Sequence, residues 1–142
     1  MLAKAISIAA KAFEGKKDKG GKPYILHCLR VMNGVDQNDE ELMTIGILHD
    51  VVEDCKEWTL SDLKFKVGFS DRVIDALYLL THRKEVSYDD YIKAIALNED
   101  ARQVKLADLK DNSNITRLKG LTKRDFDRLE KYSRSYIYLS KV

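Results

Sequence analysis

The stretch GILHDVVEDC, residues 46–55, places four polar side chains in an otherwise apolar, helix-forming segment. They are His49, Asp50, Glu53 and Asp54. An ionised carboxylate that leaves water is costly unless it is paired or bound to a cation, so this group requires a partner. On a continuous helix, residues three and four apart share a face, so the four side chains form one patch. The apolar residues around them predict that the patch lines a cleft within a helical core.

The rest of the chain repeats the helical spacing of apolar residues. It contains one proline, Pro23, and few alternating β-branched runs. Serine, threonine and aspartate stand before several apolar runs, where their side chains cap helices. The expected helices begin near residues 2, 24, 39, 59, 70, 87, 100 and 122. We therefore expect one all-α domain over residues 1–142, a bundle of about seven to eight helices. Its third helix is expected to run unbroken from 39 to 53, and a long last helix to cover 122–141.

Bulk composition gives no support to several classes of function. The 142 residues include 25 Lys and Arg against 23 Asp and Glu, and a net charge of +2 does not argue for nucleic acid or an anionic membrane. No apolar run approaches the roughly 18 residues of a spanning helix, and the N-terminus lacks the pattern of a cleavable signal. These features predict a cytoplasmic protein with neither a membrane nor nucleic acid as its partner.

Two interpretations compete for the polar patch in residues 46–55. In the first, its members are exposed helix residues or a salt-bridged cluster that meets Lys105 or Arg30. In the second, His49 and Asp50 bind a metal, because neutral imidazole and carboxylate suit first-row divalent ions such as Mn, Fe and Zn.

A metal site needs further ligands, since two adjacent residues do not make one. The candidates are His27, on the inward face of the expected second helix, and Asp108, which follows an apolar helical run. Four protein ligands on an ion that prefers about six leave positions open for water and substrate. Such an ion suits phosphate hydrolysis because it lowers the pKa of water and draws charge from phosphoryl oxygens, while a nearby carboxylate takes the proton.

Three motifs stand in the order His, His-Asp, Asp: KPYILH at 22–27, GILHDVVED at 46–54 and VKLADLKDN at 104–112. Together they resemble the HD superfamily of metal-dependent phosphohydrolases, specifically the RelA/SpoT hydrolase domain and the stand-alone small alarmone hydrolases. The resemblance covers roughly residues 1–118. It implies an all-helical HD fold and hydrolysis of the 3′-pyrophosphate of guanosine tetra- or pentaphosphate (ppGpp or pppGpp), as in the stringent response. It also implies one Mn ion held by His27, His49, Asp50 and Asp108.

The resemblance implies further roles around that ion. Glu53 and Asp54 would orient or activate the attacking water, and spacing does not choose between them. Asn112 would contact the nucleotide, and Lys19 matches the lysine of an Arg-Lys pair that the family places beside the substrate. Asp18 stands where the family has the arginine that stacks on guanine, and the segment 109–111 also departs from the family pattern.

Because of these departures, two alternatives stay open. The chain could be an HD phosphatase that acts on another phosphorylated nucleotide or nucleotide cofactor. It could also be a catalytically silent HD module that binds a nucleotide or a partner protein.

Other features have simpler interpretations. His82 is expected to be an exposed residue at a helix end, favoured there by the helix dipole. The last helix has a mixed-charge face that we expect to be solvated, with the basic residues Lys123, Arg124, Arg128, Lys131 and Arg134. The same helix carries a set of three tyrosines and one leucine that is either core or the face of a homo-oligomer: Tyr132, Tyr136, Tyr138 and Leu139.

Overall fold

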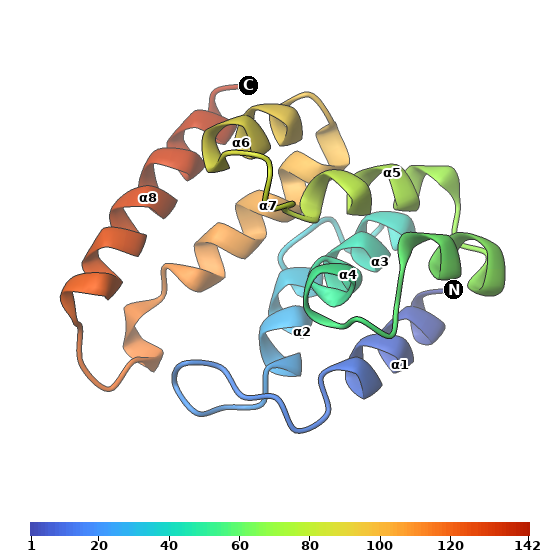
Figure 1. The fold of residues 1–142 in the computed structure, drawn as a ribbon, viewed down its shortest axis with the longest axis horizontal. Helices are drawn as coiled ribbons and strands as arrows, with labels where there is room; N and C mark the ends of the chain where they lie inside the picture. The colour runs from blue at the N-terminus through green and yellow to red at the C-terminus, as the bar shows by residue number, and fades with distance from the viewer.

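Every regular element of the computed structural model, which describes residues 1–142, is helical (Figure 1). The α-helices are α1 (Leu2–Ala12), α2 (Ile25–Asn33), α3 (Glu40–Leu48), α4 (Val51–Asp54), α5 (Asp71–Leu80), α6 (Tyr88–Ala96), α7 (Glu99–Asn112) and α8 (Lys123–Ser140). A π-helical segment covers Asp62–Val67, and a 3-10 turn covers Ile115–Arg117. The expected all-α class and helix number are confirmed.

Helix α3 lies at the centre of the fold and packs against α1, α2, α5 and α7. Its side chains Ile45, Ile47 and Leu48 are fully buried in the hydrophobic core. Gly46 allows α2 to approach, because a Cβ there would lie 3.1 Å from the Cα of Met32. Helix α8 packs on α6 and α7, on the opposite side of α7 from α2 in Figure 1. The core thus fixes α2, α3 and α7 relative to one another.

The capping residues that the sequence indicates form their expected contacts. The side chains of Asp39, Ser70 and Ser87 each accept a hydrogen bond from the backbone N–H three residues later. Thr122 and its partner at the third helical position form a full capping box at the start of α8. Helix α7 begins slightly earlier than expected, because Asn98 caps it.

The expectation of one unbroken helix from 39 to 53 is wrong. Helix α3 ends at Leu48, α4 begins at Val51, and Asp50 has φ −104° and ψ −4°. In a continuous helix the Gly46 carbonyl would accept the N–H of Asp50. Here it accepts Nδ1–H of His49 instead, at 2.7 Å. The His49–Asp50 doublet therefore lies at a helix junction and not on a helix face.

The aromatic set of α8 divides between two environments. Leu139 is buried and Tyr132 packs partly against the core, as the core interpretation requires. Tyr136 and Tyr138 are exposed, so the oligomer interface stays a prediction. None of the helices has the length and apolar character needed to cross a membrane.

Candidate active site

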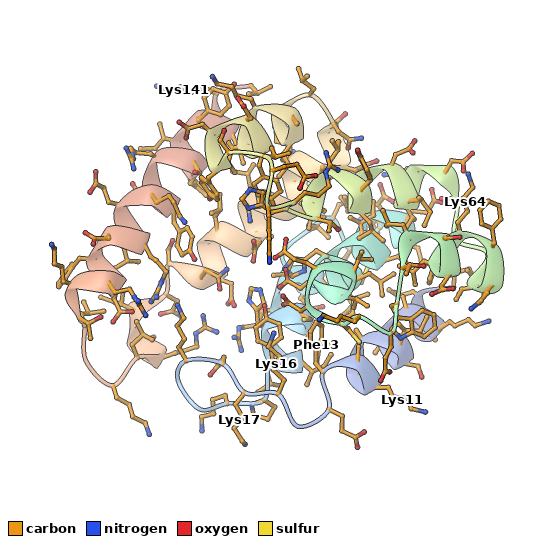
Figure 2. All side chains as sticks on the ribbon, viewed as in Figure 1. Lys11, Phe13, Lys16, Lys17, Lys64 and Lys141 are labelled. Atoms are coloured by element: carbon orange, nitrogen blue, oxygen red, sulfur yellow. The ribbon has the colours of Figure 1, made fainter.

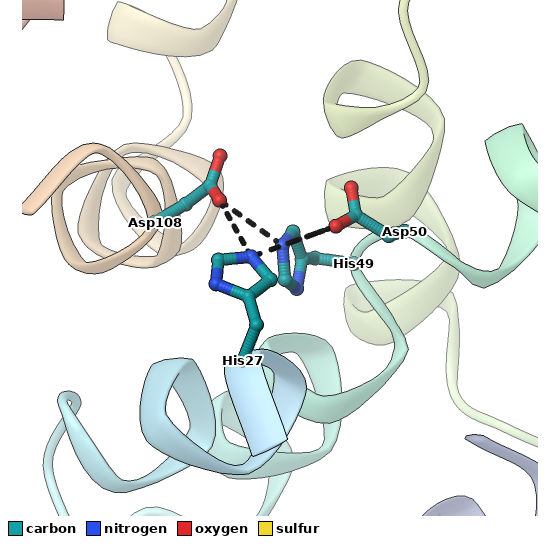
Figure 3. A group of neighbouring side chains, drawn as sticks. All are labelled: His27, His49, Asp50 and Asp108. Atoms are coloured by element: carbon teal, nitrogen blue, oxygen red, sulfur yellow. Dashed lines mark ion pairs between the residues drawn. The ribbon is translucent and has the colours of Figure 1, made fainter. Parts of the chain in front are cut away.

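Four side chains from three segments converge at the centre of the structure (Figure 3). His27 comes from α2, His49 and Asp50 from the α3–α4 junction, and Asp108 from α7. One ligand atom from each lies within 4.8 Å of the others. The distance from Asp108 Oδ1 is 3.0 Å to His27 Nε2 and 3.3 Å to His49 Nε2, and His49 Nε2 lies 3.0 Å from Asp50 Oδ2. The structure thus brings together all four predicted ligands.

The donor set fits a divalent cation. The Nε2 atoms of His27 and His49 are buried, and neither makes a hydrogen bond of good geometry although carboxylate oxygens lie 3.0–3.3 Å away. Buried polar atoms without partners are rare in proteins, and two such imidazole nitrogens facing two carboxylates make a donor set that fits a positive ion. The cluster is therefore a candidate divalent-metal site.

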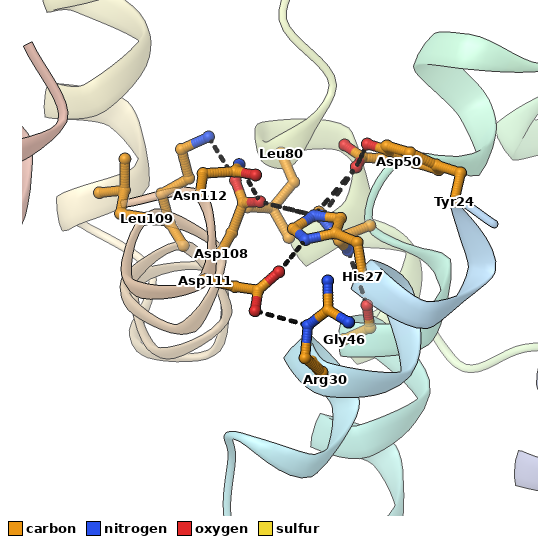
Figure 4. A network of polar contacts seen from close by, with 12 residues as sticks. Tyr24, His27, Arg30, Gly46, Asp50, Leu80, Asp108, Leu109, Asp111 and Asn112 are labelled. Atoms are coloured by element: carbon orange, nitrogen blue, oxygen red, sulfur yellow. Dashed lines mark hydrogen bonds and ion pairs between the residues drawn. The ribbon is translucent and has the colours of Figure 1, made fainter. Parts of the chain in front are cut away.

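Outer contacts hold each ligand in place (Figure 4). Both histidines use Nδ1 for an outer hydrogen bond, which leaves Nε2 for the centre: His49 donates to the Gly46 carbonyl, and His27 donates to Asp111 Oδ2 at 2.6 Å. The Tyr24 hydroxyl donates to Asp50 Oδ2 at 2.5 Å. These contacts orient the ligands before any ion binds.

Asp108 has two further partners on its own helix. Lys105 Nζ donates to Asp108 Oδ2 at 2.8 Å, and Asn112 Nδ2 donates to Oδ1 at 2.9 Å. Burial alone would raise the pKa of the Asp108 carboxyl, but Lys105 and the two histidines outweigh it and hold that pKa well below its ordinary value. The salt bridges expected between the patch at 46–55 and Lys105 or Arg30 do not form, because Lys105 pairs with Asp108 and Arg30 with Asp111.

The two carboxylates on α4 lie outside the ligand cluster and make different contacts. Glu53 Oε1 accepts a hydrogen bond from the backbone N–H of His82 at 2.6 Å. Burial raises the pKa of Glu53, and the nearby Asp50 and Asp54 carboxylates add to the effect, although the His82 N–H opposes it. Asp54 Oδ2 instead pairs with Lys16 Nζ at 3.1 Å.

His82 is not the solvated helix-end residue that its sequence context predicts. Its ring stacks on Tyr91 with centroids 4.5 Å apart, and Nε2 donates to the Val86 carbonyl at 2.7 Å. The backbone N–H of the same residue binds Glu53. The local sequence carries no sign of these contacts, because they depend on how α5 and α6 pack.

A cleft of about 360 Å³ opens beside His27, between the loop that joins α1 to α2, the C-terminal end of α7 and helix α8. Its wall is strongly basic, with a single acidic side chain, Asp18. The cations that line it are Lys16, Lys17, Lys19, Arg117 and Arg128, and Figure 2 shows the first two on the loop between α1 and α2. Asn112 also lines the cleft, so the predicted substrate residues Lys19 and Asn112 share one cavity with a metal-ligand candidate.

The loop that carries Lys19 is fixed by short-range contacts. Asp18 Oδ1 accepts a hydrogen bond from the Lys22 backbone N–H at 2.9 Å, so this carboxylate closes the loop. Gly20 packs so closely against the 3-10 turn that a Cβ there would lie 2.5 Å from the Arg117 carbonyl oxygen. Burial lowers the pKa of Lys19, and Arg128 lowers it further. Lys19 therefore lies close to basic residues of α8.

Sequence reasoning missed three residues of the site. Arg128 lines the cleft, although the basic residues of the last helix were expected to be solvated. Arg117, which precedes that helix and for which no role was expected, lines the cleft as well. Asp111, which appeared only as part of a departure from the family pattern, binds His27 and also Arg30 and Arg117. Only the polar spacing of Asp108, Asp111 and Asn112 on one helix could have indicated it.

Comparisons with known proteins agree with this geometry. No family model matches the chain. Two relatives named guanosine-3′,5′-bis(diphosphate) 3′-pyrophosphohydrolase match it: one from Vibrio cholerae at 32% identity over 122 residues, 78% of this chain, and one from Haemophilus influenzae at 34% over 116 residues, 74% of this chain. A Streptomyces coelicolor GTP pyrophosphokinase is 31% identical over 127 residues, 82% of this chain. The matched segment spans only 15–17% of the length of these three relatives.

A solved structure of a metazoan orthologue of SpoT, described as hydrolysing ppGpp, has the same fold. The TM-score is 0.76 at 21% identity, and the match covers 97% of this chain and 84% of the other.

An all-α fold in which histidine, a His-Asp doublet and a late aspartate converge defines a domain of the HD superfamily. The sequence matches place the domain more narrowly. Within that superfamily, this chain belongs to the RelA/SpoT hydrolase-domain family.

Proposed function

We propose that this chain is a metal-dependent hydrolase that removes the 3′-pyrophosphate of guanosine tetra- or pentaphosphate, with Mn²⁺ as its ion. One observation carries the proposal: two buried Nε2 atoms without hydrogen bonds face two carboxylates at the edge of a cleft lined by five cations. The names of the relatives support the same substrate. His27, His49, Asp50 and Asp108 would hold the ion. When bound, it supplies a nucleophile from water at neutral pH and neutralises charge on phosphoryl oxygens.

The chain's own groups divide the remaining work. Glu53 is the proposed proton acceptor on α4, because Asp54 is paired with Lys16 whereas Glu53 has no lysine or arginine partner, and burial raises the pKa of Glu53. Asp54 holds Lys16, whose Nζ also lies 4.2 Å from the centroid of the Tyr24 ring at the cleft wall. In the proposed reaction, water adds to the phosphorus that is bonded to the ribose 3′-oxygen, and Glu53 takes a proton from the water. The bond from that phosphorus to the 3′-oxygen breaks, and the 3′-oxygen takes up a proton to become the 3′-hydroxyl. Pyrophosphate and the 5′-phosphorylated nucleoside leave.

The basic cleft would bind the rest of the substrate. A nucleotide with phosphates at both ribose positions carries a large negative charge, and the cleft supplies lysine and arginine donors for it. Lys19 and Asn112 both line this cleft, which supports their proposed roles in substrate binding.

The direct test is to measure hydrolysis of a panel of phosphorylated nucleotides. We expect purified protein with Mn²⁺ to release pyrophosphate from guanosine tetraphosphate, and Asp50→Ala to release none above background. Asp127→Ala serves as the matched control, because it removes an exposed carboxylate without an ion pair. Equal release by wild type and Asp50→Ala would contradict the proposed site.

One observation favours a second candidate within the same class. Asp18 closes the loop where the family pattern has a guanine-stacking arginine, so selection for guanine is not secured by that residue. The panel therefore includes nucleotide cofactors with a 2′- or 3′-phosphate. Release from these alone would assign the chain to the alternative HD phosphatase, and no release from any of them would assign it to a silent binding module.

A further inference from the structure

His27 has a carboxylate of helix α7 beside each of its ring nitrogens, although only Nδ1 makes a hydrogen bond. Asp108 Oδ1 lies 3.0 Å from Nε2, and Asp111 Oδ2 lies 2.6 Å from Nδ1. The two aspartates are three residues apart on α7, so both face His27 from the same side of that helix, one beside each ring nitrogen (Figure 4). Asp108 faces the ligand cluster, whereas Asp111 lies outside it. The two carboxylates therefore have different tasks.

Asp111 is itself held in place by cations from two other segments. Arg30 Nε, on α2, donates to Oδ1 at 2.7 Å. Arg117, at the end of the 3-10 turn, donates from Nη1 to Oδ2 at 3.2 Å and from Nη2 to the backbone carbonyl of Asp111 at 2.6 Å. The Asp111 side chain is 12% exposed. A partly buried carboxylate with this many charge-assisted partners has a defined orientation.

The two histidines of the cluster differ in what lies behind them. His49 donates its outer N–H to a neutral backbone carbonyl, that of Gly46. His27 donates its outer N–H to a carboxylate, which binds the N–H more strongly and raises the basicity of the ring as a ligand. The carboxylate belongs to the segment 109–111, where this chain departs from the family pattern.

We propose that Asp111 is a positioning residue for the metal: by accepting Nδ1–H of His27, it fixes the imidazole with the Nε2 lone pair aimed at Asp50 and Asp108. The inference rests on the metal site of the proposed function. It adds Arg30 and Arg117 as the groups that keep Asp111 in place, and it links a cleft residue, Arg117, to a metal ligand.

Mn²⁺ binding measures this role without any reaction. We would titrate the purified chain with Mn²⁺ and follow the electron paramagnetic resonance of the free ion. Asp111→Ala should bind Mn²⁺ about 10–100-fold more weakly than wild type, the usual cost of losing an outer partner. Asp111→Asn should fall between the two, because an amide oxygen still accepts the N–H but carries no charge. Asp127→Asn, the same chemical change at an exposed site, should bind as wild type does.

A second readout reports the ring itself. In the Zn²⁺-loaded protein, proton–nitrogen NMR of the histidine rings should show a protected Nδ1–H on His27 in wild type and in Asp127→Asn. This signal should shift upfield in Asp111→Asn and exchange away in Asp111→Ala. A residue that served only the packing of Arg30 and Arg117 would leave the signal unchanged.

The outcomes separate this inference from the proposed function. Mn²⁺ affinity within twofold of wild type in a folded Asp111→Ala protein would overturn the role of Asp111. If that variant does not fold, wild-type affinity and an unshifted Nδ1–H in the near-isosteric Asp111→Asn would overturn it equally. A wild-type chain that binds no Mn²⁺ would overturn both proposals. Weakened binding in the variants of a protein that cleaves no nucleotide would support Asp111 while refuting the proposed activity.

Discussion

The ligand cluster and the cleft beside it are built in opposite ways. His27, His49 and Asp108 are each less than 5% exposed and come from helices that the hydrophobic core holds together. The cleft is lined by a loop, a 3-10 turn and one face of α8, with charged side chains that remain partly in water. A change in the first region disturbs packing and charge balance at once. A change in the second alters mainly the surface that a ligand meets, except at Gly20 and Arg117, which also contact each other or Asp111. The core thus constrains the ligand cluster more tightly than it constrains the cleft surface.

Asp108→Ala should give the largest effect, because it changes the buried ligand cluster. It removes a ligand candidate that lies near both histidines, and it leaves Lys105 buried without its ion-pair partner. We expect Mn²⁺ binding and hydrolysis to be lost, and the free energy of unfolding in urea to fall by about 3–5 kcal/mol.

Lys105→Met combined with Asp108→Ala is the control for that result. The double variant removes both charges, so it should recover much of the lost stability without recovering the metal. If Asp108→Ala alone retains Mn²⁺, Asp108 is not a ligand.

Glu53→Gln should leave Mn²⁺ binding intact and lower turnover by about 10²–10⁴-fold, the usual contribution of a general base. Burial, with Asp50 and Asp54 nearby, raises the pKa of Glu53 above its ordinary 4.5, although the His82 N–H and Lys105 oppose this. Only the deprotonated form accepts a proton, so wild-type turnover should fall on acidification at a higher pH than for an ordinary glutamate. At saturating Mn²⁺, Glu53→Gln should lack that part of the pH profile.

Asp54→Asn is the matched comparison for Glu53→Gln on the same short helix. It breaks an exposed ion pair with Lys16 and should lower turnover only several-fold. A larger loss of turnover in Asp54→Asn than in Glu53→Gln would mean that Asp54, and not Glu53, is the general base.

Arg128→Gln and Lys19→Gln should affect binding and not chemistry. We expect KM for guanosine tetraphosphate to rise about tenfold in each, since a hydrogen bond to a charged group contributes about 1.5 kcal/mol, while kcat holds. Steady-state kinetics over a range of salt should also show a weaker salt dependence of KM. Lys93→Gln, on α6 and outside this cleft, should leave KM unchanged. A fall in kcat at constant KM would place these cations in the chemical step.

Asp18→Arg should have the smallest effect, and it tests whether the cleft contributes to recognition of the base. It restores the planar cation that stacks on a base, so relative use of guanine over adenine nucleotides should rise a few-fold. It also removes the hydrogen bond to Lys22, which limits the gain. Asp18→Asn keeps an acceptor for that bond and separates the two effects. Unchanged relative use in Asp18→Arg would exclude position 18 from base recognition.

The sequence predicted the buried half of the molecule better than the cleft. Apolar spacing and capping residues located the helices because these are local signals, and the ordered motifs around His27, His49 and Asp108 located the candidate ligands. The break between α3 and α4 was not predicted, because it depends on a side chain that takes the carbonyl of Gly46. Asp111 was missed because its partner His27 lies 84 residues away in the chain.

The close approach of Gly20 to Arg117 joins the two halves of the molecule mechanically. Any side chain at position 20 would have to push the loop off the 3-10 turn, since its Cβ would lie 2.5 Å from the Arg117 carbonyl oxygen. That displacement would widen the mouth of the cleft and, through the guanidinium that grips Asp111, slacken the support behind His27. A substitution at Gly20, which lies outside the ligand cluster, would thus change both the width of the cleft and the support of His27.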